Sequence, residues 1–328
     1  MEAALYDPEE GYYTRGARIG EGGDFVTSAS VSPLFAAAMA RRFADDAARM
    51  EGPLDFVEVG AGEGRFLEEL ARTLARDIPG LARRLRWTAV ERSPAAREAI
   101  ARRGIEPEPW LLASAAELAE GSVSGWIFAN ELYDALPVAR VRGGAAGGPE
   151  ELRVALQGGR FVWTPVPAAE DLREHLARLG VTLEPGQIGE VALGAAALHR
   201  RLARALARGR LVVFDYGHRA RNLYHPLARR HGTLAVHERG RRGGDPLERP
   251  GEVDLTAHVN WSELERVGEE EGLTTDALAR QARFLLESGI FELVRDDREK
   301  WRAYRLVDPE GMGEEISVLL QSRAIERL

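Results

Sequence analysis

The sequence predicts an α/β protein built on a parallel sheet with helices on both faces. Short apolar runs alternate along the chain with segments of helical periodicity. The runs "LDFVEVG" (54–60), "RWTAVERS" (86–93) and "SGWIFANELYD" (124–134) are typical of buried strands. The helical segments "RFLEELARTLARDI" (65–78) and "PAAREAIARR" (94–103) follow the first two runs. Such alternation indicates parallel strands joined by crossover helices.

The remaining segments predict an added lobe and a helical C-terminal region. Residues 1–33 are rich in turns, and a helix is expected over 33–50, with Ser32 as its cap. A glycine-rich break at 140–150 precedes two strand-like runs separated by "QGG", which indicates a hairpin. A long helical pattern (189–209) leads to the strand-like run "RLVVFDYG" (210–217), and the region from Trp261 is mostly helical in pattern. We therefore expect three stretches. Residues 1–140 hold an N-terminal segment and the ligand-binding half of the sheet core, residues 141–208 form a smaller inserted lobe, and residues 209–328 hold the remaining core strands and the helical C-terminal region.

Composition excludes several classes of protein. The chain has 328 residues and a net charge of −8, which argues against a dedicated nucleic-acid-binding protein. Cysteine is absent, so disulfides and thiolate metal sites are excluded, and no metal is expected. No apolar run approaches the roughly 20 residues that span a bilayer. The N-terminus lacks the pattern of a signal peptide. A cytoplasmic protein without membrane insertion is expected.

The turn after the first predicted strand indicates a nucleotide-type cofactor. Gly60, Gly62 and Gly64 stand between a strand and a helix, where backbone N–H groups can approach a ligand. Dinucleotide-binding folds place a third glycine five positions after the first, and that position here is Arg65. Glu58 stands two residues before Gly60, a pattern that resembles the S-adenosylmethionine (AdoMet) methyltransferase signature. A turn without any ligand is the simpler alternative.

Acidic and amide side chains follow the second and third strands. Glu91 ends the second strand and has two carboxylate oxygens that can accept from ribose hydroxyls. Asn130, Glu131 and Asp134 cluster where the third strand ends. Because ligands of open parallel sheets bind at the carboxyl ends of strands, we expect a cleft there. The alternative is that Asn130 and Glu131 cap the next turn.

Eight segments in order carry a resemblance to a known family. They are "ALYDPEEGYYTRG", "GDFVTSASVSPLF", "VEVGAGEGRF", "ANELYDALPV", "VVFDYGH", "GTLAVHERG", "PGEVDLTAHVNWSEL" and "QARFLLESGI". Over nearly its full length the chain resembles the MidA-type methyltransferases. The resemblance implies a Rossmann-like class I methyltransferase sheet with an added lobe, and AdoMet as cofactor. This family includes the mitochondrial protein-arginine methyltransferase that assists assembly of respiratory complex I.

The chain departs from the family pattern in three places. Members usually have further residues before the segment that here begins at Ala4, so the start of the chain is expected to be shortened. Ala29 and Ser30 stand where a proline and a glutamate are usual, and Asn260 where an aspartate is usual. The lost glutamate puts the acceptor, or turnover itself, in doubt.

An arginine acceptor defines the expected roles. A guanidinium is protonated at neutral pH and is held best by carboxylates, and a histidine can take up its proton. The expected catalytic residues are Glu131, Asp134, Asp215, His218 and His258. The expected cofactor-binding residues are Glu58, Gly60, Gly62, Gly64, Glu91 and Asn130. The expected substrate-binding residues are Asp24, Thr27, Ser28, Asp254 and Thr256.

The predicted function is AdoMet-dependent methylation of an arginine in a partner protein, by resemblance a subunit of a respiratory complex. Three alternatives stay open. The acceptor could be a small molecule or another protein side chain. The chain could be an assembly chaperone that binds AdoMet without turnover, or a nicotinamide oxidoreductase, against which Arg65 argues. Homo-oligomer formation is also left open.

Overall fold

The chain forms two compact units in the computed structural model, which describes residues 1–15, 28, 32–145, 148–238 and 241–325. The sheet unit contains Arg18–Leu132, Leu198–Asp215 and Val267–Leu328. The hairpin unit contains Met1–Ala17, Tyr133–Ala197 and Tyr216–Arg266. These borders differ from the three expected stretches, because the second unit also takes up the N-terminal segment and the residues after Asp215.

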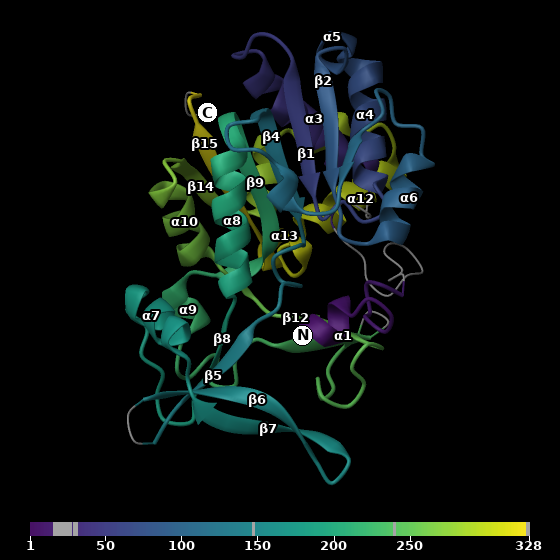
Figure 1. Ribbon diagram of the computed structural model, residues 1–328. Coiled ribbons are helices and arrows are strands. Elements are labelled where there is room, and N and C mark those ends of the chain that lie inside the picture. Colours follow the sequence, from purple (N-terminus) through teal and green to yellow (C-terminus); the bar gives the residue numbers. More distant parts are fainter. Residues whose placement is uncertain (16–27, 29–31, 146–147, 239–240, 326–328) are drawn as a thin grey trace. The chain divides into compact units, whose positions relative to one another are not determined.

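The sheet unit has the predicted α/β architecture, with helices on both faces of the sheet (Figure 1). Its strands lie in the order β14-β15-β9-β4-β1-β2-β3. The pairs β3-β2, β2-β1, β1-β4 and β4-β9 are parallel, and β14 is antiparallel to β15. The strands are β1 (Leu54–Val59), β2 (Leu85–Val90), β3 (Trp110–Leu112), β4 (Val123–Asn130), β9 (Leu206–His218), β14 (Thr274–Arg280) and β15 (Ile316–Arg323). The helices are α3 (Pro33–Ala47), α4 (Arg65–Asp77), α5 (Pro79–Ala82), α6 (Pro94–Ala101), α8 (Leu193–Ala205), α10 (Trp261–Glu270), α11 (Gln281–Glu287), α12 (Asp297–Val307) and α13 (Met312–Glu315), with 3-10 turns at Ala115–Glu117 and Ile290–Leu293.

Aromatic packing surrounds the central strands of this sheet. Every residue of β1 is buried, as expected for a strand covered on both faces. The ring of Phe66 on α4 stacks on Phe128 of β4 with centroids 4.7 Å apart, and Phe56 and Phe35 pack beside them. This core fixes the start of α4, and therefore the glycine turn that precedes it.

The predicted N-terminal cap of α3 is confirmed. The Oγ atom of Ser32 accepts a hydrogen bond from the backbone N–H of Leu34 at 3.2 Å, and Pro33 occupies the first turn. Proline fits this position because its missing N–H has no partner in a first turn anyway.

The hairpin unit is organised around two small antiparallel sheets. One has the order β7-β6-β5-β8 and the other β11-β10-β12. Its strands are β5 (Ala139–Gly143), β6 (Pro149–Gln157), β7 (Arg160–Pro167), β8 (Ile188–Val191), β10 (Ala235–Glu238), β11 (Arg241–Arg242), β12 (Asp254–Thr256) and β13 (Val259–Asn260), and its helices are α1 (Glu2–Tyr6), α7 (Glu170–Arg178) and α9 (Ala220–Leu223). The hairpin predicted around "QGG" is present, and its turn residues Gly158 and Gly159 have positive φ. Val141, Leu172, Leu176 and Val191 form a separate core.

Two strands of the C-terminal region were not expected from the sequence. The run "ISVLLQSR" forms β15 and "TTDALAR" forms β14, beside the helices that the pattern did predict. A short apolar run fits a buried strand and a buried helix equally well, so only pairing in the sheet separates them. Among the helices in the described part of the chain, none has the length and apolar character needed to cross a bilayer.

A fully buried arginine joins three elements of the sheet unit. Arg210 of β9 donates to Asp46 of α3 at 2.7 Å and is also bonded to Asp276 of β14. Trp126 of β4 donates to the same Asp46 oxygen at 2.8 Å. The side chains of Arg210 and Asp46 are 1% and 0% exposed. Each of the two charges is therefore stabilised by the other rather than by water.

Arg210→Met should destabilise the protein strongly, because it removes a buried cation that the carboxylates of Asp46 and Asp276 share. The expected loss in free energy of unfolding is about 3–5 kcal/mol, the range for breaking a buried ion pair from one side. Urea unfolding followed by circular dichroism measures it. Arg72→Met, which removes an exposed ion pair with Glu68, is the control and should change little. Equal stability of the two variants would contradict the assigned role of Arg210.

Candidate cofactor and acceptor site

Parallel pairing brings four chain turns to one edge of the sheet. Val59 at the end of β1 pairs with Val90 of β2 and with Ala129 of β4, and Val90 pairs with Leu112 of β3. The segments that follow these strands therefore leave the sheet at the same level. This edge is where open parallel sheets bind ligands.

The glycine turn after β1 has a backbone that glycine accommodates readily. Gly60, Gly62 and Gly64 have φ of 75°, 52° and 74°, in the left-handed region. A Cβ atom on Gly60 would lie 2.8 Å from Leu132 Cδ1, and one on Gly64 would lie 2.8 Å from Ile100 Cγ1. Gly64 is the cap residue of α4, so the turn leads into a helix N-terminus. Such a turn leaves backbone N–H groups accessible to a ligand.

Glu91 connects the turn after β2 to the glycine turn. Its Oε2 accepts from the backbone N–H of Gly62 and its Oε1 from that of Ser93, both at 2.8 Å. Burial raises the pKa of this carboxyl group. Two bonds do not exhaust the acceptor capacity of a carboxylate. Glu91 can therefore order the turn and still accept from the hydroxyls of a ribose.

Two buried oxygen atoms at this edge have no hydrogen-bond partner among the described residues. They are Oε2 of Glu58 and Oδ1 of Asn130. The carboxyl group of Glu58 also accepts from the backbone N–H of Leu67, and burial together with the charge of Glu91 raises its pKa well above the usual value. Unpartnered buried acceptors gain most from a ligand that donates and carries positive charge. The ammonium and sulfonium groups of AdoMet meet that requirement, so the residues at this edge fit the cofactor.

Glu131 follows β4 in a strained conformation. Its φ of 49° is unusual for a residue other than glycine. Its Oε1 accepts from the backbone N–H of Ser28 at 2.7 Å and from Nδ2 of Asn130 at 3.1 Å. Ser28 is held in turn by Gln281, whose Oε1 accepts from its hydroxyl at 2.7 Å. Ser28 was expected to bind substrate, and the structure gives it a contact that positions Glu131.

Asp215 lies fully buried in β9 and supports the same loop. Its Oδ2 accepts from the backbone N–H of Leu132 at 3.1 Å. The contact places this carboxylate behind the loop that carries Glu131. Asp215 thus supports this loop, and the catalytic role expected of it stays a prediction.

The hairpin unit contains the other predicted catalytic residues. His218 and His258 lie side by side with ring centroids 5.2 Å apart, because β13 pairs with the end of β9 at Val259 and Gly217. The carbonyl oxygen of Asp134 accepts from the N–H of Ala257 at 2.8 Å. The segments "DYGH", "DLTAHV" and "ELYD" therefore meet, although they are far apart in the sequence.

The two histidines differ in their surroundings. Arg229 donates to Nε2 of His218, which places the proton of the neutral ring on Nδ1. Burial, followed by the nearby His218 and Arg242, lowers the pKa of His258 to about 4. His258 is therefore neutral at neutral pH and a weak base, which reduces its capacity for the expected proton uptake.

Asp254 and Thr256 bond to residues of the protein itself. Tyr13 donates to Oδ1 of Asp254 at 2.9 Å, which attaches the N-terminal segment to β12. Oγ1 of Thr256 lies 3.0 Å from Nε2 of His237. The other two expected substrate-binding residues, Asp24 and Thr27, lie outside the described residues.

The sequence analysis missed one segment of the cofactor edge. Glu91 donates its backbone N–H to the carbonyl of Leu112 at 2.9 Å, which brings the end of β3 beside it. Ser114 and Glu117 then form a capping box. The pattern S-x-x-E after an apolar run was the available signal. It was overlooked because β3 has three residues and begins with an exposed tryptophan.

The fold and this edge together define an AdoMet-dependent methyltransferase. The chain belongs to the family described as S-adenosyl-L-methionine-dependent methyltransferases, whose model matches residues 36–279. AdoMet is accordingly the cofactor.

Curated relatives are about a quarter identical to the chain over the aligned residues. The "Protein arginine methyltransferase NDUFAF7, mitochondrial" of Bos taurus is 26% identical over 88% of this chain and 69% of its own length. The zebrafish (Danio rerio) protein of the same name is 25% identical and covers 100% of this chain and 84% of its own length.

Solved structures agree with the fold. A protein from Burkholderia thailandensis, bound to S-adenosyl-homocysteine, is 32% identical with a TM-score of 0.88. The match covers 99% of this chain and 87% of that one. A native structure from the same organism has a TM-score of 0.85.

Gly62→Val should abolish AdoMet binding. A β-branched side chain disfavours φ near 50° and would occupy space against the backbone of the turn. Titration calorimetry with AdoMet measures the loss. Gly80→Ala, at a position with open space around it, is the control and should bind like the wild type. Wild-type affinity in Gly62→Val would remove the glycine turn from the cofactor site.

The raised pKa of Glu58 predicts a pH-dependent stability of the cofactor-free protein. The folded state retains a proton on this group above the pH at which the unfolded chain loses it. Stability should therefore fall as pH rises from about 4.3, the usual glutamate value, through the folded-state pKa. Glu58→Gln should remove that part of the decline, measured by thermal unfolding against pH. Glu98→Gln, at an exposed position, should leave the profile unchanged, and identical profiles for all three proteins would contradict the prediction.

Proposed function

We propose that the methyl acceptor is an arginine side chain of a partner protein. The observation that carries the proposal is the Glu131 carboxylate, which stands at the carboxyl end of β4, on the edge that also holds the glycine turn. The names of the bovine and zebrafish relatives, protein arginine methyltransferases, support the same acceptor. The family resemblance favours a subunit of a respiratory complex as the partner.

The roles of the residues follow from their contacts. AdoMet supplies a methyl group already activated by its positively charged sulfur. Glu58, Glu91 and Asn130 would hold the cofactor through its donors, with the glycine turn against it. The enzyme must then align the acceptor nitrogen with the methyl group and exclude water.

Glu131 would hold the acceptor guanidinium. A planar guanidinium matches a carboxylate in charge and in the spacing of its donors. The bonds from Ser28 and Asn130 fix the direction of the carboxylate, so it need not reorganise when the acceptor binds. The negative charge also offsets the positive charge that the guanidinium carries until its proton leaves.

Glu131→Gln should separate cofactor binding from turnover. Glutamine keeps the shape and an oxygen that can accept from Ser28, but it removes the charge. We expect AdoMet affinity within a few-fold of the wild type and methyl transfer lowered by about a hundredfold or more, the scale of one lost transition-state contact. Calorimetry and transfer of labelled methyl groups measure the two quantities. Glu120→Gln, at an exposed glutamate of the same unit, should change neither.

The acceptor itself can be identified directly. The protein is incubated with methyl-labelled AdoMet and a lysate of its own source, and labelled products are located by mass spectrometry. Label on an arginine of a protein supports the proposal. Label confined to small molecules, or to another protein side chain, overturns the arginine acceptor and leaves the methyltransferase assignment standing.

A further inference from the structure

Among the described residues of the hairpin unit, five basic side chains gather in one cluster. They are His218 at the end of β9, Arg229 after α9, His237 on β10, Arg242 on β11 and His258 before β13. The rings of His218 and His258 have centroids 5.2 Å apart, and Arg229 donates to Nε2 of His218. His237 and Arg242 are partners in the register of β10 and β11, so their side chains leave the same face of that sheet. We call these five residues the basic cluster.

The two halves of the basic cluster meet at His258. Nε2 of His237 lies 3.0 Å from Oγ1 of Thr256, two residues before His258. The charges of both arginines and of the two other histidines act on the His258 ring, and all four disfavour its protonated form. Arg242 is exposed, and the other members are half-buried. The cluster therefore keeps part of its surface in contact with solvent.

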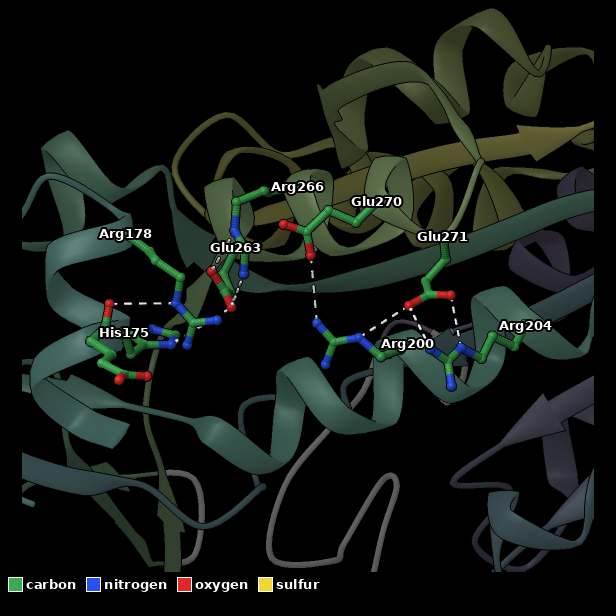
Figure 2. Close-up of polar contacts among 9 residues, drawn as sticks. His175, Arg178, Arg200, Arg204, Glu263, Arg266, Glu270 and Glu271 are labelled. Carbon is green, nitrogen blue, oxygen red and sulfur yellow. Dashed lines mark hydrogen bonds and ion pairs between the residues drawn. The ribbon is translucent and has the colours of Figure 1, made fainter. Parts of the chain in front are cut away.

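The basic cluster has no counter-charge of its own. Among the described residues, no carboxylate lies within ion-pair distance of either arginine of the cluster. Glu190 and Glu263 line a small pocket beside His258, but each already has a cationic partner. Glu190 lies 3.3 Å from Arg140, and Glu263 lies 2.7 Å from Arg266, a pair that Figure 2 shows.

Two further carboxylates near the cluster are also engaged. Asp254 stands opposite His237 in the register of β10 and β12, and its Oδ1 accepts from Tyr13 at 2.9 Å. Glu238, which follows His237, forms an ion pair with Arg249 at 2.6 Å. Positive charges gathered without an anion repel one another, and a bound anion removes that cost.

The charges of the cluster match a doubly charged anion. Arg229 and Arg242 keep their charges at neutral pH, because a guanidinium loses its proton only above about pH 12. Arg229 donates to the carbonyl of Asn222 and to His218, which leaves three of its five N–H donors for a ligand. His258, with a pKa of about 4, is neutral and offers an N–H group rather than a charge. Two fixed positive charges beside neutral donors suit a phosphate group better than a singly charged carboxylate.

We propose that the basic cluster is a binding site for a phosphate group, either free phosphate or a phosphate attached to a larger molecule. Arg229 and Arg242 supply the charge and most of the donors, and the three histidines border the bound group. The site lies within the hairpin unit. Its existence does not depend on AdoMet or on the identity of the methyl acceptor.

Anion binding to the full chain tests the proposal. Inorganic phosphate and sulfate are titrated by calorimetry at pH 7, with sodium chloride holding the ionic strength constant. We expect saturable binding of one anion per chain. Arg229→Gln and Arg242→Gln should each weaken it by about tenfold or more, the scale of one lost charged hydrogen bond. Arg230→Gln is the matched control, because its side chain donates to the carbonyl of Pro185, and it should bind like the wild type.

The titration of His258 gives a second readout. Sulfate keeps both of its charges where histidines titrate, so it is the probe, and His258→Gln assigns the NMR signal. An anion favours the protonated ring, so saturating sulfate should raise the pKa of His258 by about one unit or more. The other four members of the cluster, and Glu190 and Glu263 on the pocket wall, face the ring both with and without sulfate.

Phosphoserine with blocked ends separates the two sources of the phosphate group. Tighter binding than that of inorganic phosphate supports an attached group, and equal or weaker binding supports free phosphate. Absence of saturable binding of phosphate and sulfate overturns the proposal, and so does an equal loss of binding in Arg230→Gln. Arg242→Gln changes an exposed side chain, so it decides the question where Arg229→Gln does not fold. None of these measurements uses AdoMet, so their failure is distinct from failure of the proposed acceptor.

Discussion

The parallel register of the central strands is the constraint on which the cofactor site depends. Val59, Val90, Leu112 and Ala129 lie at one level of the sheet because β1, β2, β3 and β4 run in the same direction. Each strand then releases its following turn at the same edge. The glycine turn that begins at Gly60 and the amide of Asn130 are 70 residues apart in the sequence, with Glu91 between them. The parallel pairing brings all three to the same edge of the sheet. A shift of register would displace Glu91 from the N–H of Gly62, which it contacts at 2.8 Å.

Electrostatics at this edge favours a cationic ligand. Glu58 is buried and Glu91 is partly buried. Loss of water raises the pKa of both carboxyl groups, and the charge of Glu91 raises that of Glu58 further. A ligand with an ammonium and a sulfonium relieves that cost, whereas a nicotinamide dinucleotide adds phosphate charges. The charges at this edge therefore favour AdoMet over a nicotinamide dinucleotide, although the glycine turns for the two cofactors look alike. The buried cation Arg210 likewise lies between two carboxylates, those of Asp46 and Asp276.

The position of several candidate residues could be predicted from the sequence, but their contacts could not. Glu58, Glu91 and Asn130 lie at one edge of the sheet, as predicted, because strand ends and glycine spacing are local features. Ser28 was expected to contact substrate, yet its amide and hydroxyl bond to Glu131 and Gln281, the latter 253 positions away. Asp215 was expected to be catalytic, and the structure adds a contact that the sequence does not reveal, a hydrogen bond from the backbone N–H of Leu132. A carboxylate looks the same in sequence whether it accepts from a substrate or from the protein's own backbone.

The sequence by itself determined the alternation of strands and helices, the glycine turn and the hairpin, because each depends on periodicity or on φ preferences of a few adjacent residues. The family resemblance added the cofactor. Only the tertiary structure decided that β14 and β15 join the sheet, and that "DYGH" meets "DLTAHV" through the pairing of β13 with β9. These features rest on contacts between residues far apart in the chain. Their energies come from burial and pairing, which local sequence does not encode.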